Sequence, residues 1–150
     1  MKKISILFLS IMIGISSLAH RPIEIDQKLL QSFDSSFPNA QEVSWLDITD
    51  AYEVSFLQNG IRTRILYPKD QSFIRFTRYY KEENFSYPLQ LLVKKAYPGK
   101  KIFGITEISQ VSDNSITVVY YVIIEDAKKW LTILLDNDGN ISVVNKFRKY

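Results

Sequence analysis

Two helical stripes, separated by 60 residues from Pro38 to Pro98, are the feature that most limits how this chain can fold. In each stripe apolar residues recur every three or four positions, and an aromatic residue followed by proline ends the pattern. Ser86 is a candidate N-cap for the second stripe, with Pro88 in its first turn. The pattern predicts two copies of one helix, over about residues 25–37 and 86–97. The stripes consist of Ile25, Leu29, Leu30, Phe33 and Phe37, then Leu89, Leu92, Val93, Ala96 and Tyr97.

After each helix the apolar period changes to two, which is typical of strands with one buried face. The alternating segments are 43–46, 52–56, 61–67 and 73–80, then 102–108, 116–124, 130–135 and 141–147. A shift of 68 residues places Tyr52 on Tyr120 and Ile65 on Ile133. We therefore predict an α+β fold of two tandem repeats, about 25–80 and 86–150, each a helix followed by four antiparallel strands. Joining the repeats edge to edge gives one continuous sheet with both helices on one face, and hides a strand edge.

Asn59-Gly60 predicts a two-residue hairpin turn, because both residues tolerate a positive φ. With the turn at this place, Ser55 faces Arg64 and Leu57 faces Arg62. Cross-strand pairs of this kind contribute about 0.2–1 kcal/mol each and explain the charges without a ligand.

The first residues follow the pattern of a secretory signal peptide: Lys2 and Lys3, an apolar run over 4–15, and small residues at Ser17 and Ala19. The run is shorter than the about 20 residues that span a bilayer, although an uncleaved anchor remains the alternative. We predict a signal peptide over 1–19, cleavage after Ala19, one domain over 20–150 with no stable membrane span, and a periplasmic or secreted location.

The composition is sufficient for one domain with a single hydrophobic core that contains no cysteine. The chain has 150 residues, 46% of them hydrophobic, and no cysteine, so disulfides are excluded. The predicted leader holds two of the 19 Lys and Arg, which leaves 17 basic residues against 16 acidic ones. Nucleic acid is not an expected partner, because binding to phosphates depends on a surplus of basic residues.

One stretch resembles a known family. Phe37-Pro38-Asn39-Ala40, followed by Val43 and Trp45, then Tyr52, Val54, Phe56 and Asn59-Gly60, resembles the PepSY-like, β-lactamase-inhibitor-like family of exported bacterial proteins. The second repeat matches more loosely, as Tyr97-Pro98-Gly99 without an equivalent tryptophan. The resemblance implies a fold of two helix-plus-sheet repeats and, by analogy with an inhibitor, a binding role. It carries no catalytic residues over to this chain.

No motif predicts catalysis, a cofactor or a metal site. His20 is the single histidine, so a copper site with a second imidazole cannot form. It lies at the expected start of the mature chain, far in sequence from any structured serine, so a Ser-His-acid triad is not expected. In Asp136-Asn137-Asp138-Gly139-Asn140 the glycine is fourth, whereas a calcium loop requires it sixth, so a β-turn is favoured. The carboxylate pairs Glu82-Glu83 and Glu125-Asp126 are expected in solvated loops. We therefore expect a protein that is not an enzyme.

The second repeat has an apolar surface on the side of the sheet away from the helices. If Tyr120 and Val122 face the helix, alternation turns their neighbours to the other side, where water is expected. Exposed apolar surface containing Trp and Tyr is typical of interaction sites. The simpler interpretation is that another segment, or the second subunit of a homodimer, covers it. The candidate binding residues are Tyr121, Ile123, Trp130 and Leu134, next to Val119, with Arg62 and Arg64 at a polar margin and Trp130 and Tyr121 as anchors.

These observations favour a non-enzymatic binding protein of the cell envelope that acts on an exported protein or peptide, with an inhibitor-like module as one form of this role. A carrier or sensor of a small apolar ligand is the alternative and requires a closed pocket. An enzyme of unrecognised type is the third hypothesis. The predicted cores consist of Phe33, Phe37, Trp45, Tyr52, Val54 and Phe56 in the first repeat and Leu89, Val93, Tyr97, Tyr120, Val122 and Ile133 in the second.

Overall fold

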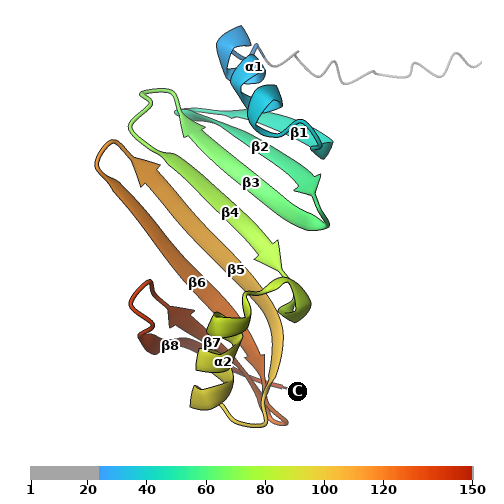
Figure 1. Ribbon diagram of the computed structural model, residues 1–150, viewed down its shortest axis with the longest axis vertical. Coiled ribbons are helices and arrows are strands. Elements are labelled where there is room, and N and C mark those ends of the chain that lie inside the picture. Colours follow the sequence, from blue (N-terminus) through green and yellow to red (C-terminus); the bar gives the residue numbers. More distant parts are fainter. Residues whose placement is uncertain (1–23, 150) are drawn as a thin grey trace, which may run out of the picture.

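Eight antiparallel strands pair in the order in which they follow one another along the chain (Figure 1). The computed structural model describes residues 24–149, so the predicted leader, its cleavage site and His20 lie outside the described residues. The elements are α1 Gln27–Ser36, β1 Gln41–Ile48, β2 Ala51–Gln58, β3 Ile61–Pro68, β4 Ile74–Tyr80, a 3₁₀ turn Glu82–Asn84, α2 Tyr87–Ala96, β5 Lys101–Ser112, β6 Ser115–Glu125, β7 Lys129–Leu135 and β8 Ile141–Arg148. The predicted single antiparallel sheet is confirmed.

The β2–β3 hairpin has the predicted register. Asn59 and Gly60 adopt φ values of 51° and 76°, as a tight turn between twisted strands requires. Ser55 then faces Arg64 and Leu57 faces Arg62. A two-residue turn thus fixes which side chains of β2 and β3 share a face.

Both edge strands carry irregularities. In β1 the register shifts between Gln41 and Ser44, where Glu42 has a φ of 52°. On the other edge, the pairing of β7 with β8 shifts between Thr132 and Ile133. Such bulges interrupt the row of free backbone groups that an edge strand offers to another chain.

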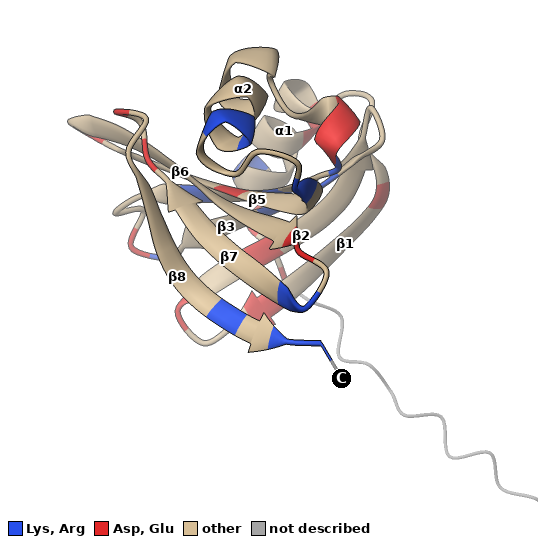
Figure 2. Cartoon of the chain, turned by 90° about the horizontal axis from the view of Figure 1, so that it is seen from below, with Lys and Arg blue, Asp and Glu red and all other residues tan. Residues whose placement is uncertain are grey.

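Both helices lie on the same side of the sheet (Figure 2). α1 begins at Gln27, later than the apolar pattern indicates, because the Asp26 carboxylate accepts a hydrogen bond from the Lys28 backbone N–H at 2.8 Å. Ser86 occupies the N-cap position of α2 but makes no side-chain capping bond. Within the described residues, neither helix is long and apolar enough to cross a membrane.

The first core lies between α1 and strands β1–β4. Phe33 of α1 is 2% exposed and packs edge-on against Trp45 and Phe56, with ring centroids 5.3 Å and 5.2 Å away. Aromatic pairs in this geometry stabilise beyond their buried area. The cluster comprises Phe33, Val54, Phe56 and Ile65, with Phe37, Ala40, Trp45, Tyr67 and Phe76 packed against it.

The second core lies between α2 and strands β5–β8. Val93 of α2 is 1% exposed, and Val122 and Ile133 are fully buried beneath it. The cluster comprises Phe85, Val93, Ile102, Ile105, Val122, Ile124, Leu131, Ile133 and Leu135, with Tyr80, Leu89, Tyr97, Tyr120 and Ile141 packed against it.

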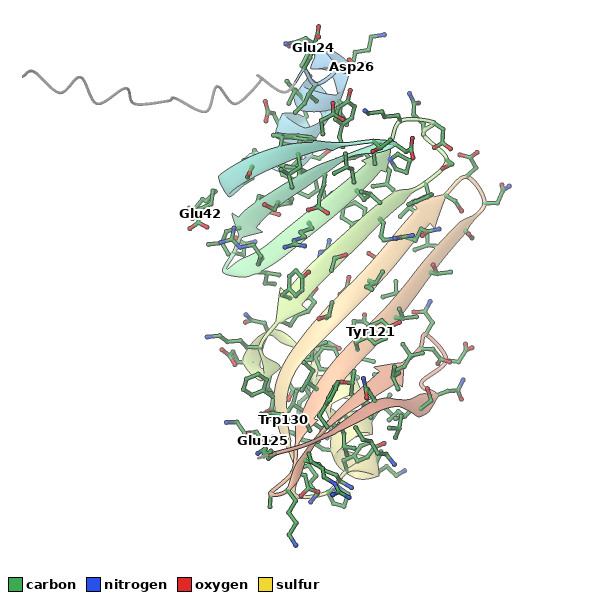
Figure 3. All side chains as sticks on the ribbon, turned by 180° about the vertical axis from the view of Figure 1, so that it is seen from behind. Glu24, Asp26, Glu42, Tyr121, Glu125 and Trp130 are labelled. Atoms are coloured by element: carbon green, nitrogen blue, oxygen red, sulfur yellow. The ribbon has the colours of Figure 1, made fainter. Side chains whose placement is uncertain are left out.

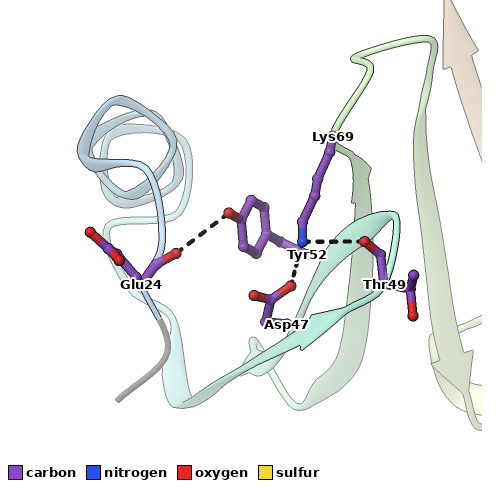
Figure 4. Close-up of polar contacts among 5 residues, drawn as sticks. All are labelled: Glu24, Asp47, Thr49, Tyr52 and Lys69. Atoms are coloured by element: carbon purple, nitrogen blue, oxygen red, sulfur yellow. Dashed lines mark hydrogen bonds and ion pairs between the residues drawn. The ribbon is translucent and has the colours of Figure 1, made fainter. Parts of the chain in front are cut away.

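Tyr52 departs from the predicted core. It is on the helix side of β2 but is half-buried and lies beside the first cluster, with its ring directed towards Glu24 (Figure 4). Its hydroxyl donates to the Glu24 carbonyl at 3.4 Å, and the Lys69 ammonium lies 4.9 Å from its ring centre. The Lys69 Nζ also donates to Asp47 at 2.7 Å. The phenol needs a polar partner, and the sheet margin supplies one.

Candidate functional site

The sheet surface opposite the helices, here called the open face, carries the predicted binding residues, of which Figure 3 labels Tyr121 and Trp130. Strand pairing places Arg62 opposite Tyr79, Tyr79 opposite Thr106, Thr106 opposite Tyr121 and Tyr121 opposite Leu134. Directly paired residues share a face, so these five side chains form one row across β3–β7. The structure therefore brings together three of the predicted residues, with Tyr79 between them.

Tyr79 is a member of this row that the sequence reasoning missed. It is 40% exposed, and the Arg64 guanidinium carbon lies 5.9 Å from its ring centre. Arg64 is exposed and, within the described part of the chain, has no carboxylate within ion-pair distance. The alternation of Tyr79-Tyr80 was the available signal, since one of two adjacent tyrosines must face away from the helices.

Arg62 has a partner within the chain. Its guanidinium forms an ion pair with Glu42, from the bulge of β1. Both side chains are more than 40% exposed, so the pair adds little to stability. Arg62 is therefore a neutralised margin of the row, whereas Arg64 keeps its charge available.

Trp130 belongs to a separate cluster at one end of the open face. Its ring meets Phe103 edge-on at 4.8 Å between centroids, and the Lys149 ammonium lies 4.5 Å from its ring centre. Phe147 is its direct cross-strand partner. Ile123 pairs with Thr132, between this cluster and the row of Tyr121. The two predicted anchors thus lie in different groups of side chains, as Figure 3 shows.

The predicted exposure of this face is only partly correct. Tyr121, Ile123, Trp130 and Leu134 are all half-buried, because neighbouring side chains of the sheet cover one another. The most exposed apolar residues of the region are Phe103 and Phe147, at 58% and 56%. Phe103 reaches this side at a bulge between Ile102 and Gly104, which no sequence pattern indicated.

Arg78 of β4 lies on the helix side of the sheet and not on the open face. It pairs in register with Thr63 and Glu107, on the helix side. Its Nη1 donates to the Glu107 carboxylate at 3.2 Å, and the Tyr80 hydroxyl donates to the same group at 2.8 Å. Burial and then this hydrogen bond raise the pKa of Tyr80. Arg78, Tyr80 and Glu107 thus form a hydrogen-bonded network that lies between the two cores.

Three of the four carboxylates in the Glu82-Glu83 and Glu125-Asp126 pairs have a lysine partner. Glu125 accepts from Lys149 at 2.6 Å and Asp126 pairs with Lys100 at 2.7 Å, and each hydrogen bond lowers the pKa of its carboxyl. Glu82 pairs with Lys94 and belongs to the 3₁₀ turn rather than to a loop.

The acidic 136–140 segment forms a turn between β7 and β8. Asp136 accepts hydrogen bonds from the backbone of Asp138 and Asn140, and the Asn140 side chain lowers the pKa of its carboxyl. Within residues 24–149 no group of three or more potential metal ligands is clustered.

Two depressions lie at the ends of the sheet, and both are shallow and open to solvent. One is lined by the β1–β2 and β3–β4 turns, including Asp50, Lys69 and Phe73. The other is lined by Ala127, Lys128, Lys129, Arg148 and Lys149. Neither lies between a helix and the sheet, where an apolar ligand would be enclosed.

This arrangement defines an α+β fold in which two helices cover one face of an eight-stranded antiparallel meander. A BLIP-like protein from Bacteroides fragilis NCTC 9343 has a similar fold, with a TM-score of 0.59 and 12% identity, over 84% of this chain and 87% of that one. A DUF2874 family protein from Bacteroides uniformis ATCC 8492 matches with a TM-score of 0.58 and 14% identity, over 83% and 90%. A Bacteroides eggerthii DSM 20697 protein described provisionally as periplasmic matches with 0.58 and 12%, over 84% and 90%.

No protein-family model and no curated protein sequence matches the chain. At these low identities the likeness establishes a BLIP-like fold and nothing further. The PepSY-like part of the resemblance remains a prediction.

Proposed function

We propose that the protein is an exported, non-enzymatic binding module whose open face receives another exported protein or peptide. The observation that carries the proposal is the row of Arg62, Tyr79, Thr106, Tyr121 and Leu134, aligned by the strand register on the face opposite the two described helices. Tyrosines in the middle of an exposed sheet surface, with arginine at its edge, are typical of protein interfaces.

Three further observations support the proposal. The N-terminal pattern predicts export to the periplasm or beyond, and one structure of similar fold is described provisionally as periplasmic. A BLIP-like fold is compatible with an inhibitor-like role. We also infer that the two helix-plus-four-strand halves are copies of one PepSY-like unit, which has diverged on the open face.

The carrier alternative receives less support. A small apolar ligand requires an enclosed pocket, whereas the two depressions described above are shallow and lined by turns. A homodimer that forms through the open face is the remaining alternative, and the experiment below distinguishes it from binding to a different protein.

The test is recovery of partners from an envelope extract by the tagged protein, with identification by mass spectrometry. Tyr121→Ala combined with Leu134→Ala should abolish recovery of a specific partner while the melting temperature stays within a few degrees. Ile116→Ala is the matched control, because Ile116 is apolar and 68% exposed but lies outside the row. Equal recovery by both variants would contradict the proposal, and recovery of only the protein itself would favour the homodimer.

A further inference from the structure

One end of the second half of the sheet is strongly basic. Because the strands are antiparallel, the starts of β5 and β7 and the ends of β6 and β8 meet there. Figure 2 shows blue segments at the start of β7 and the end of β8. The side chains that gather at this place, here called the basic end, are Lys100, Lys101, Lys128, Lys129, Arg148 and Lys149.

Only part of this charge is neutralised within the described residues. The six cations of the basic end face two carboxylates, Glu125 and Asp126, which pair with Lys149 and Lys100. Six minus two leaves a net charge of four. The acidic residues of the other loops in this half, including Asp113 and Asp136, lie at the opposite ends of the strands. A domain that is nearly neutral overall thus has a local surplus of positive charge at the basic end.

The strand register increases the local repulsion. Lys129 of β7 and Arg148 of β8 are direct cross-strand partners, an arrangement of like charges that destabilises a sheet. The backbone holds them in place, because the Lys149 N–H donates to the Lys128 carbonyl and the Asp126 N–H donates to the Lys129 carbonyl, both at 3.0 Å. Lys128, Lys129, Arg148 and Lys149 also line one shallow depression. An anionic surface placed against this end would relieve the repulsion.

Exposed aromatic rings lie beside these charges. Phe103, Trp130 and Phe147, here called the aromatic triplet, contact one another or pair across strands at the same end of the open face. Two of the rings are more than half exposed. Aromatic side chains next to lysines and arginines are characteristic of the interface between a bilayer and water, where rings enter the headgroup layer and cations meet phosphates.

We propose that the basic end and the aromatic triplet dock the protein on an anionic phospholipid surface. This goes beyond the proposed function, because it uses the end of the sheet and leaves the Tyr121 row free for a partner. Each lysine or arginine near an anionic membrane contributes to binding, and the attraction weakens with salt. The charge and the rings act together, because a small number of cations or a small number of aromatic rings alone does not hold a protein on a membrane.

The test is co-sedimentation of the protein, purified from the envelope, with vesicles. Wild-type protein should bind phosphatidylcholine vesicles that contain phosphatidylglycerol and should bind pure phosphatidylcholine weakly. The variant Lys128→Gln, Lys129→Gln, Arg148→Gln should lose about tenfold or more in affinity. The matched control is Lys28→Gln, Arg75→Gln, Lys81→Gln, which removes the same net charge from exposed residues elsewhere and should bind like wild type. All protein samples have the same N-terminus, so a difference in vesicle binding between them reflects the substituted side chains.

A spectroscopic readout tests the aromatic contact. The protein has two tryptophans, so Trp45→Phe leaves Trp130 as the only indole. Its emission should shift to shorter wavelength on anionic vesicles, and Phe103→Ser with Phe147→Ser should weaken vesicle binding. Equal affinity of the two triple variants, or an unshifted emission, would overturn the proposal. So would displacement by glycerol phosphate, which would indicate a small-anion site, or equally tight binding to polyglutamate, which would indicate an acidic protein.

Discussion

Arg78 of β4 and Glu107 of β5 face each other across the only strand pair that joins the two halves of the described sheet, and their side chains form an ion pair of 3.2 Å. The Glu107 side chain is 11% exposed and the Arg78 side chain 39%. The carboxylate also accepts from Tyr80, so it has two donors in a poorly solvated place.

The first prediction follows from this asymmetry of exposure. Arg78→Leu should lower the free energy of unfolding by about 1–3 kcal/mol, because it leaves a nearly buried carboxylate without its cation. Arg78→Leu combined with Glu107→Leu should recover most of the loss, since it removes the unpaired charge. Urea unfolding of the two single variants and the double variant measures this coupling. Additive losses would show that the two side chains act independently.

The second prediction concerns the first core. Phe56 is fully buried, with the rings of Phe33 and Phe37 at 5.2 Å and 4.9 Å. Phe56→Ala should cost about 3–5 kcal/mol of unfolding free energy, through lost burial and the cavity left behind. Leu46→Ala is the control, because Leu46 is 50% exposed on β1 and should cost under about 1 kcal/mol. A melting curve of Phe56→Ala that matches wild type would place Phe56 outside the core.

The third prediction is a dependence of stability on alkaline pH. Burial raises the pKa of Tyr67 from 10.0 to about 12, so the folded protein keeps this phenol protonated where the unfolded chain ionises. The contribution is fully present below pH 10 and is lost as the pH rises through about 12. Between about pH 9 and 11, wild type should lose more stability in urea than Tyr67→Phe, which has no phenol to ionise. An equal loss in both proteins would assign the alkaline effect to other groups.

The fourth prediction concerns the N-terminus. Protein purified from the envelope should begin at His20, because Ser17 and Ala19 are small residues placed for signal-peptide cleavage. Intact-mass measurement checks this directly. Ala19→Arg should block processing and leave the longer chain, whereas a wild-type protein that keeps Met1 would contradict the signal-peptide interpretation.

Alternation and turn chemistry predicted much of the fold. Asn59-Gly60 set the register of β2 and β3, and alternation along β6 separated Val122 from Tyr121 correctly. These features depend on neighbours in the sequence, where the period of two and the preference for positive φ act directly.

Contacts between strands distant from any tight turn were not predictable. Trp130 and Phe103 meet because a bulge in β5 sends Phe103 to the open face. Arg78 meets Glu107 only through the register of β4 on β5, which spans a helix and its loops. Alternation assigns a residue to a face, but a bulge or a long connection decides what lies beside it.

The meander order has a consequence for how the chain assembles. Every strand pairs with the strands that directly precede and follow it, so each ladder is closed by a hairpin or, between β4 and β5, by the segment containing α2. Each strand pairing therefore closes only a short loop and has a small entropy cost, and no described strand pairs with one from a distant part of the sequence. Each strand after β1 pairs with the strand that directly precedes it in the chain, so the sheet extends in sequence order from β1 to β8.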